Sequence, residues 1–307
     1  MTRMLKKSRN QETYFSHDFT IDGHSAAVYS LTTSAAHIYS SSGDKYVARW
    51  DKTGVQDKFA IRLDKPSYAI KFIDKAKVLV IGGSDGALNI FDTVSKKEIR
   101  CITQHRHAIF SIEENKDRNH IYVGDQEGYL SIWESNSWEL QMMIHLNCGK
   151  IRSIHYSSSE KLLFLGKQNG EISIFETEYY NEIKSFKANK DGVSSILFCE
   201  NRKLIASGGN DAHISIWNLE GDQVSSIPAH NYTIYSLLTF SNDISISASR
   251  DRSVKIWKGF FESVIQKIDH KSQGHNFSVN TLVKMDDTSF LSGGDDTKII
   301  RFKNTNH

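Results

Sequence analysis

The chain has 307 residues, 24% of them charged, and its formal net charge is +2. A charge so close to balance gives no whole-molecule case for binding polyanions, which makes nucleic acid an unlikely partner class. The three cysteines, Cys101, Cys148 and Cys199, are widely spaced without a CxxC pair, which argues against zinc or redox chemistry and predicts free thiols. No stretch approaches the ~18 continuous apolar residues of a membrane span. We therefore expect a cytoplasmic protein, or a nuclear one if the source is eukaryotic.

The first segment, residues 1–12, is basic and polar and lacks the apolar run of a secretory signal. We expect it to be a flexible basic arm. Residues 13–307 are expected to form one domain, because a single repeated pattern occupies nearly all of them.

That pattern is an aromatic residue preceded six positions earlier by an acidic residue or asparagine. The aromatic residues are Trp50, Phe91, Trp133, Phe175, Trp217, Trp257 and Phe302. Their partners are Asp44, Asp85, Glu127, Asn169, Asp211, Asp251 and Asp296. Successive aromatics are 40 to 45 residues apart, and a period of about 40–45 residues is typical of four-stranded propeller blades.

Each repeat carries four strand signals in the same order. The first strands are expected at 28–31, 68–72, 109–112, 151–154, 193–196, 234–237 and 279–282. The second are expected at 38–40, 78–81, 121–123, 162–165, 204–207, 244–247 and 290–292. A tight turn rich in Gly, Asp and Asn then leads to a third strand that ends at the aromatic residue. The fourth strand follows it, for example at 58–61 or 140–144.

Closure of the ring requires a further strand. Only five residues follow Phe302, whereas Thr13 to Ile21 read as a strand ahead of the first repeat. Ile21 precedes His24 by three residues, as Ile227 precedes His230, so the N-terminal strand should complete the last blade. The predicted fold is all-β: a seven-bladed β-propeller of four-stranded antiparallel blades, with neighbouring blades stacked around a ring.

The repeats resemble the WD40 family, whose blades carry a tetrad of histidine, serine or threonine, aspartate and tryptophan. The tetrad maps onto His24, Ser40, Asp44 and Trp50 in the first blade and onto His230, Ser247, Asp251 and Trp257 in the sixth. The seventh has His275, Ser292, Asp296 and Phe302, and the fifth has Asn189, Ser207, Asp211 and Trp217. In the second and fourth, Leu63 and Asn147 stand where histidine would be. The resemblance covers about residues 13 to 303.

A histidine, serine and aspartate set also invites interpretation as a hydrolase triad. Repetition argues against this, because an enzyme needs one exposed triad, and we expect the tetrads to be buried and structural. His105 and His107 could be offered as metal ligands. However, His105 stands at the blade-histidine position, and no carboxylate or thiol partner is evident in the sequence. No catalytic residue, cofactor site or metal site is expected.

Arg49 and Arg301 occupy the position before the aromatic, where the other five repeats have isoleucine. Buried arginines need carboxylate partners, and Asp18 on the closing strand is one candidate. We expect this pair of arginines to strengthen the junction between the first and last blades; a ligand-binding role is the alternative.

The resemblance implies that partners bind the face formed by the tight turns and by the loops leading into the innermost strands. Carried over position by position, the candidate contacts are Tyr29, Tyr68, Phe110, Lys150, Arg152, Tyr235, Arg250 and Asn280. Aromatic and basic groups suit an acidic or phosphorylated peptide, although these aromatics could instead simply cap the channel. The preferred function is a non-catalytic protein-interaction scaffold, monomeric on its own. The alternative is a small-molecule-binding or enzymatic propeller that uses its central channel.

Overall fold

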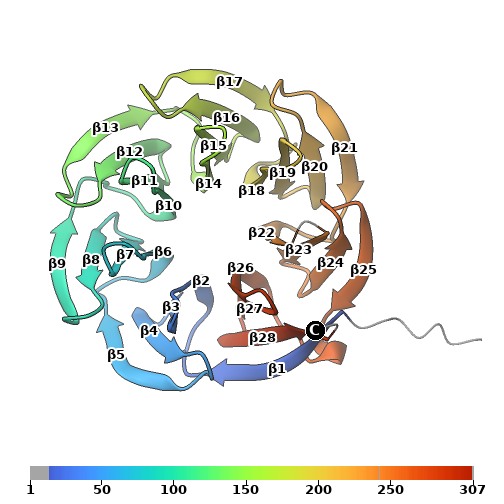
Figure 1. Cartoon of the computed structure of the whole chain (residues 1–307), viewed down its shortest axis with the longest axis horizontal. Coiled ribbons are helices and arrows are strands. Elements are labelled where there is room, and N and C mark those ends of the chain that lie inside the picture. Colours follow the sequence, from blue (N-terminus) through green and yellow to red (C-terminus); the bar gives the residue numbers. More distant parts are fainter. Residues whose placement is uncertain (1–13, 242, 306–307) are drawn as a thin grey trace, which may run out of the picture.

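The computed structural model describes residues 14–241 and 243–305, so the arm expected at 1–12 lies outside the described residues. Strands β1 to β28 form seven four-stranded antiparallel sheets, arranged as blades around a central opening (Figure 1). The predicted all-β, seven-bladed propeller is confirmed.

The blades follow one another in chain order. Blade 1 contains β2 (Val28–Thr33), β3 (His37–Ser42), β4 (Tyr46–Asp51) and β5 (Gln56–Arg62); blade 2 contains β6 (Ser67–Ile73), β7 (Val78–Gly83), β8 (Leu88–Asp92) and β9 (Lys97–Ile102). Blade 3 contains β10 (Ile109–Asn115), β11 (His120–Asp125), β12 (Tyr129–Glu134) and β13 (Leu140–His145); blade 4 contains β14 (Ile151–Ser157), β15 (Leu162–Lys167), β16 (Glu171–Glu176) and β17 (Glu182–Lys187). Blade 5 contains β18 (Val193–Cys199), β19 (Leu204–Gly209), β20 (His213–Trp217) and β21 (Gln223–Pro228); blade 6 contains β22 (Ile234–Ser241), β23 (Ile244–Ser249), β24 (Val254–Lys258) and β25 (Ser263–Ile268). Blade 7 contains β26 (Val279–Asp286), β27 (Ser289–Gly294), β28 (Lys298–Asn304) and β1 (Phe15–Asp22), and a short 3-10 helix, η1 (His270–Ser272), precedes it.

The two ends of the described chain meet in blade 7, as predicted. Strand β1 pairs antiparallel with β28, from Phe15 opposite Asn304 to Asp22 opposite Lys298, and Figure 1 shows the two side by side. A side chain of blade 6 also holds this strand: the Gln266 Oε1 accepts the Phe15 N–H at 2.8 Å, and its Nε2 donates to the Phe15 carbonyl at 2.7 Å. The closing strand is therefore fixed from both sides.

Hydrophobic side chains at repeating positions build the core between the blades. The aliphatic residue three positions before each aromatic is at most 1% exposed in all seven blades: Val47, Leu88, Leu130, Ile172, Ile214, Val254 and Ile299. One core cluster joins Ile246 and Val254 of blade 6 to Phe290 and Ile300 of blade 7. Each such side chain stabilises the fold by about 1.5–3 kcal/mol through burial, so stacking of neighbours holds the ring together.

Every innermost strand has a β-bulge at its second residue. The pairing register shifts there in all seven blades, leaving as the bulged residues Tyr29, Tyr68, Phe110, Arg152, Ser194, Tyr235 and Asn280. A bulge leaves one residue out of the ladder and re-aims its side chain. All seven of these side chains line the central cavity.

A hydroxyl that follows the bulge ties one blade to the next. Ser195 Oγ accepts the Leu237 N–H at 3.0 Å, and Ser236 Oγ accepts the Leu282 N–H at 3.2 Å. These bonds satisfy backbone groups on inner strands and fix the positions of the bulges relative to one another.

Candidate functional site

The predicted tetrads of blades 1 and 6 come together. In blade 1, His24 Nδ1 lies 2.8 Å from Asp44 Oδ2 and its Nε2 lies 2.7 Å from Ser40 Oγ, which also accepts the Trp50 Nε1–H at 2.8 Å. The corresponding distances among His230, Asp251, Ser247 and Trp257 are 2.9, 2.7 and 2.8 Å.

These contacts have the connectivity of a hydrolytic triad, but the serine cannot attack a substrate. Ser40 is 0% exposed, and its oxygen is already engaged by both the His24 ring and the Trp50 indole. A nucleophile needs a free lone pair that faces the substrate. The geometry instead ties the loop at His24 to the tight turn at Asp44.

Blades 5 and 7 carry partial versions of the tetrad. His275 lies 2.8 Å from Asp296 and 2.7 Å from Ser292. In blade 5, Asn189 Nδ2 donates to Asp211 at 3.0 Å, while its Oδ1 is buried without a hydrogen-bond partner. Asparagine therefore replaces only one of the two contacts that a histidine makes.

Blade 3 corrects the predicted pattern. His105 does have a carboxylate partner, Asp125, at 2.8 Å, and its Nε2 lies 2.7 Å from Ser131 Oγ, which accepts from Trp133 Nε1 at 2.7 Å. The expected turn residue, Glu127, is exposed and takes no part. The acid comes from the end of β11, and the serine comes from β12. A fixed six-residue spacing therefore misses this network.

Blades 2 and 4 lack the network. Leu63 and Phe91 pack partly buried against one core cluster, an apolar replacement for histidine and tryptophan. In blade 4 Asn147 is exposed, and the buried Lys167 pairs instead with Glu171 at 2.9 Å.

The two unusual arginines have different partners. Arg301 NH1 lies 3.2 Å from Asp18 of the closing strand, as expected. The same expectation is wrong for Arg49. Its Nε donates to Asp57 of its own blade at 2.6 Å, and its NH1 donates to the Thr93 carbonyl of blade 2 at 3.1 Å. The position before the aromatic faces the following blade, so Arg49 joins blades 1 and 2, away from the closure.

Neither of the two histidines considered as metal ligands lies in a group of ligating side chains among the described residues. His105 is committed to its tetrad, and His107 is exposed. Within residues 14–241 and 243–305, no three side chains of His, Cys, Asp or Glu are grouped so that they could hold a metal ion.

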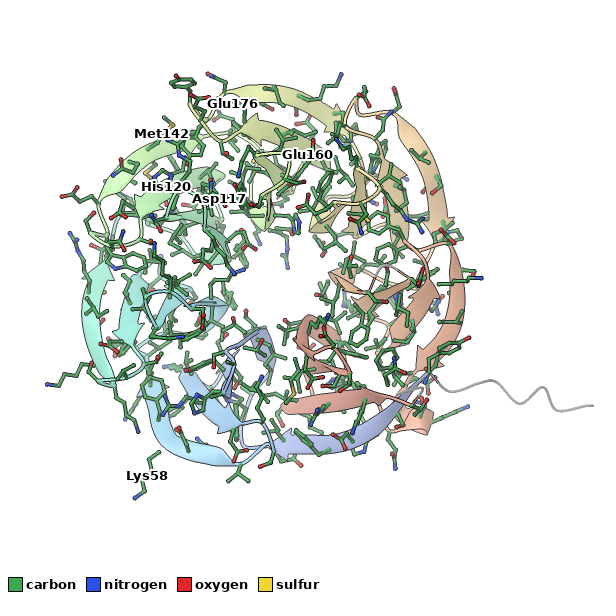
Figure 2. All side chains as sticks on the ribbon, in the orientation of Figure 1. Lys58, Asp117, His120, Met142, Glu160 and Glu176 are labelled. Carbon is green, nitrogen blue, oxygen red and sulfur yellow. The ribbon has the colours of Figure 1, made fainter. Side chains whose placement is uncertain are left out.

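The bulged residues surround a cavity of about 830 Å³ in the middle of the ring. Side chains project toward this opening and leave its centre free (Figure 2). Of the eight predicted contact residues, seven line it: Tyr29, Tyr68, Phe110, Lys150, Arg152, Tyr235 and Asn280. We call this set the channel mouth. Arg250 instead lines a separate groove.

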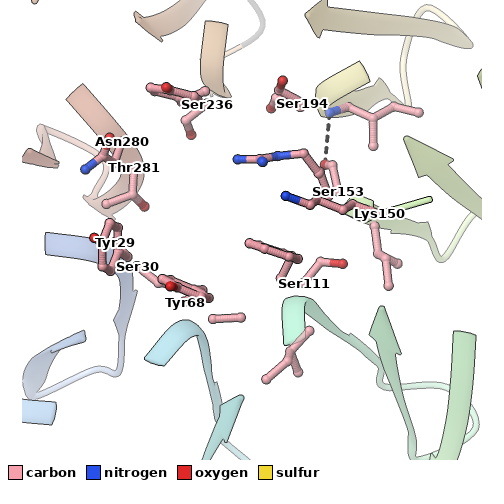
Figure 3. Close-up of a pocket in the computed structure, with 18 of the residues that line it drawn as sticks. Tyr29, Ser30, Tyr68, Ser111, Lys150, Ser153, Ser194, Ser236, Asn280 and Thr281 are labelled. Atoms are coloured by element: carbon pink, nitrogen blue, oxygen red, sulfur yellow. Dashed lines mark hydrogen bonds between the residues drawn. The ribbon is translucent and has the colours of Figure 1, made fainter. Parts of the chain in front are cut away.

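Aromatic rings form a continuous row along one side of the channel mouth. Tyr29 packs edge-on against Tyr68 with ring centroids 5.0 Å apart, and Tyr68 stacks on Phe110 at 5.3 Å. Figure 3 shows Tyr29 and Tyr68 together on one wall. Rings held in this way lose little further freedom on binding a ligand.

Two cations continue the row. The Lys150 ammonium lies 5.1 Å and the Arg152 guanidinium 5.2 Å from the Phe110 ring centroid, and Figure 3 shows Lys150 pointing into the cavity. Among the described residues, neither side chain has an ion-pair partner. Burial lowers the pKa of Arg152, with Tyr235 acting weakly in the opposite direction. A partly dehydrated cation without a counter-charge favours an anionic ligand.

At the Tyr29 end of the aromatic row, the neighbouring Asn280 (Figure 3) already has hydrogen-bond partners. Asn280 Nδ2 donates to Asp295 at 2.7 Å and to the Val28 carbonyl at 3.0 Å. Burial, with the nearby Tyr68 and Asp295, raises the pKa of Tyr29 and keeps its hydroxyl protonated as a donor. The mouth thus has a basic end at Arg152 and, near Tyr29, a hydrogen-bonding end that includes the Asp295 carboxylate.

Deeper residues of the cavity were missed by the sequence analysis. Glu113 and His155 line it below the bulges, and Glu113 lies 2.5 Å from Lys71 of the neighbouring blade. Although burial raises the pKa of Glu113, Lys71 holds it below its ordinary value. Glu113 and His155 stand two residues after Ser111 and Ser153, which also line the cavity, and strand residues two apart share a face, so this spacing is the signal that could have found them.

Comparison with known families supports the resemblance of these repeats to WD40 repeats. The family model described as WD domain, G-beta repeat (WD40) matches residues 15–51, 180–218 and 221–258. Each match ends at or just past a tryptophan whose indole donates to the serine of the second strand, in blades 1, 5 and 6. No curated protein matches the chain. The described residues contain no helix long and apolar enough to span a bilayer.

Proposed function

The chain belongs to the WD40-repeat family of β-propellers, and from this premise we propose that it is a non-catalytic interaction platform whose channel mouth binds a partner protein. WD40 propellers are commonly used for protein interaction. The observation that carries the proposal is the pair of cations, Lys150 and Arg152, that extend an aromatic row without any acidic partner. Buried tyrosine and arginine side chains are the usual anchors of protein interfaces.

The expected ligand is an acidic or phosphorylated segment of the partner. A carboxylate or phosphate can accept bidentate hydrogen bonds from the Arg152 guanidinium while an apolar neighbour packs on Phe110. The Tyr29 and Tyr235 hydroxyls can then bond the backbone of the bound segment. A near-neutral chain with a small basic pocket fits a localised acidic motif better than a long polyanion.

The test is affinity recovery of the partner from the native cell. The triple variant Tyr29→Ala/Arg152→Ala/Tyr235→Ala should lower recovery at least ~10-fold, because it removes aromatic area and the charged anchor together. Lys58→Ala is the control, since Lys58 lies on the outer periphery of the ring (Figure 2). Both variants should melt as wild type does. Undiminished recovery by a folded triple variant would contradict the proposal.

A second candidate is a small polar ligand in the channel, supported by Glu113 and His155. Burial lowers the pKa of His155, and its ring makes no hydrogen bond to any other described residue, which leaves a neutral donor and acceptor facing the cavity. Native mass spectrometry of the purified protein distinguishes this small-ligand candidate from the interaction platform. A retained small-molecule adduct that disappears in His155→Ala would favour this candidate over the platform.

A further inference from the structure

A second cavity, of about 560 Å³, lies between blades 6 and 7 and shares no lining residue with the channel mouth. We call it the blade 6–7 groove; its principal lining residues are Tyr232, Arg250, Arg252, Lys267, His270 and Phe277. It combines exposed aromatic rings with a surplus of positive charge.

The acids of the tetrads fix the backbone beside two exposed aromatic residues. Tyr232 and Phe277 each stand two residues after a blade histidine and are 59% and 55% exposed. The residue before Tyr232 donates its N–H to Asp251 at 3.1 Å, and the residue before Phe277 donates its N–H to Asp296 at 2.9 Å. Large apolar rings exposed on a rigid frame mark contact surfaces.

Only blades 6 and 7 place a tyrosine or phenylalanine at this position. The equivalent residues in blades 1 to 5 are Ala26, Lys65, His107, Gly149 and Asp191. Because blades 6 and 7 are neighbours, the two rings line the same groove.

The acids of the groove are already engaged, whereas its arginines are not. Asp251 accepts hydrogen bonds from His230 and Ser253, and Asp269 accepts the Lys271 N–H and pairs with Lys267 at 3.3 Å. Arg250 and Arg252 flank Asp251 on the tight turn and are exposed. No described carboxylate pairs with either of them.

The turn that carries these arginines is preorganised. Asp251 N–H donates to Ser249 Oγ at 3.0 Å, and Arg252, in the left-handed region at φ 68°, donates its N–H to the Ser249 carbonyl at 3.2 Å. The two guanidinium groups therefore project from a fixed turn, which lowers the entropy lost when both bind one ligand.

We propose that the blade 6–7 groove is a separate docking site for an acidic peptide segment. Carboxylate or phosphate groups of the segment bind Arg250 and Arg252, and an apolar side chain packs between Tyr232 and Phe277. Charge complementarity selects an anionic occupant, and the aromatic pair selects one with an apolar residue beside its charges. The inference goes beyond the channel-mouth proposal and requires none of its residues.

The experiment measures fluorescence anisotropy of short labelled peptides with the full chain. The probes are a glutamate peptide with one central leucine, its phosphoserine counterpart, a glutamate peptide with serine in place of leucine, and a lysine peptide of equal length. We expect both anionic leucine peptides to bind, the serine peptide to bind more weakly, and the lysine peptide not to bind. Affinity should fall as salt is raised. The stronger of the two anionic leucine peptides identifies carboxylate or phosphate as the preferred group.

Matched variants locate the binding. Arg250→Ala/Arg252→Ala should weaken binding at least ~10-fold, because charge-assisted hydrogen bonds are lost. The control Lys58→Ala/Lys97→Ala removes the same charge from exposed positions on β5 and β9 and should leave affinity unchanged. Phe277→Ser should weaken binding several-fold, whereas Ile99→Ser, at a 52% exposed site on β9, should not.

In an Arg152→Ala background, which removes the charged anchor of the channel mouth, the arginine double variant should still bind the anionic leucine peptides at least ~10-fold more weakly than its lysine control. The proposal is overturned if neither anionic leucine peptide binds the wild type, or if the arginine double variant binds them as well as its lysine control. It is also overturned if a single-stranded oligonucleotide binds through Arg250 and Arg252 while the peptides do not.

Discussion

At the scale of single residues, the tetrads show how hydrogen-bond partners turn a reactive set of groups into a structural one. Histidine, serine and aspartate are arranged as in a hydrolase, but the tryptophan indole occupies the serine oxygen in blades 1, 3 and 6. Because each tetrad is buried and charge-assisted, changes of its acid should affect stability.

The first prediction concerns pH and the His230–Asp251 pair. Burial lowers the pKa of His230. Burial raises the pKa of Asp251, but hydrogen bonds from His230 and Ser253 outweigh it and hold that pKa well below its usual range. In both cases the unfolded chain takes up its proton first as pH falls. The contribution of His230 is thus present above about pH 6.5 and lost below it, and that of Asp251 is lost below about pH 4.

Urea denaturation across this range checks the prediction. Asp251→Asn should lower the free energy of unfolding by about 2 kcal/mol at neutral pH. It should also remove part of the loss below about pH 4 while keeping the loss between about pH 7 and 5. Asp64→Asn, at an exposed position, should change neither. Equal acid sensitivity of the Asp251→Asn variant and the wild type would contradict the assignment.

The second prediction distinguishes the two candidate acids of blade 3. Asp125→Ala should lower the free energy of unfolding by about 3–5 kcal/mol, because it leaves His105 buried without its partner. Glu127→Ala should change it by less than about 0.5 kcal/mol, since Glu127 is exposed. Chemical denaturation of both variants measures the difference, and similar losses would mean that the turn acid participates.

At the scale of elements, the strands and the closure were predictable because they follow from the spacing of aromatic and aliphatic residues. The bulges were not, since an inserted residue leaves no trace in hydrophobic alternation. Yet the bulge explains why the channel-mouth residues converge: it turns the second residue of each inner strand toward the cavity. Family resemblance located these positions in the sequence, and the register supplies their physical cause.

The third prediction concerns the closing strand. Gln266→Ala should destabilise the protein by about 2 kcal/mol, because three hydrogen bonds to the backbone of Tyr14 and Phe15 are lost. Amide exchange at Phe15 should accelerate more than exchange in inner strands. Gln223→Ala on β21 is the matched control, with an exposed glutamine on an outer strand. Unchanged exchange at Phe15 would show that β28 alone holds β1.

At the scale of the whole molecule, the buried residues that the repeats share build the ring, whereas residues that differ between repeats line the channel mouth and the blade 6–7 groove. Period and composition predicted the ring, but which residues meet across it depends on closure and on the direction of each side chain. Arg250 was assigned to the channel mouth from its place beside a turn, whereas the ring places it over the junction of blades 6 and 7. Arg49 was likewise paired with the closure, though it faces blade 2. Spacing along the chain carries no information on such lateral contacts.

The most direct test of the channel mouth is hydrogen–deuterium exchange of the full chain with and without its recovered partner. The account predicts protection at the starts of β2, β6, β10, β14 and β22, around Tyr29, Tyr68, Phe110, Arg152 and Tyr235, while the outer strands β5, β9, β13 and β17 exchange as in the free protein. Protection confined to the outer strands, with the inner-strand starts unchanged, would contradict it.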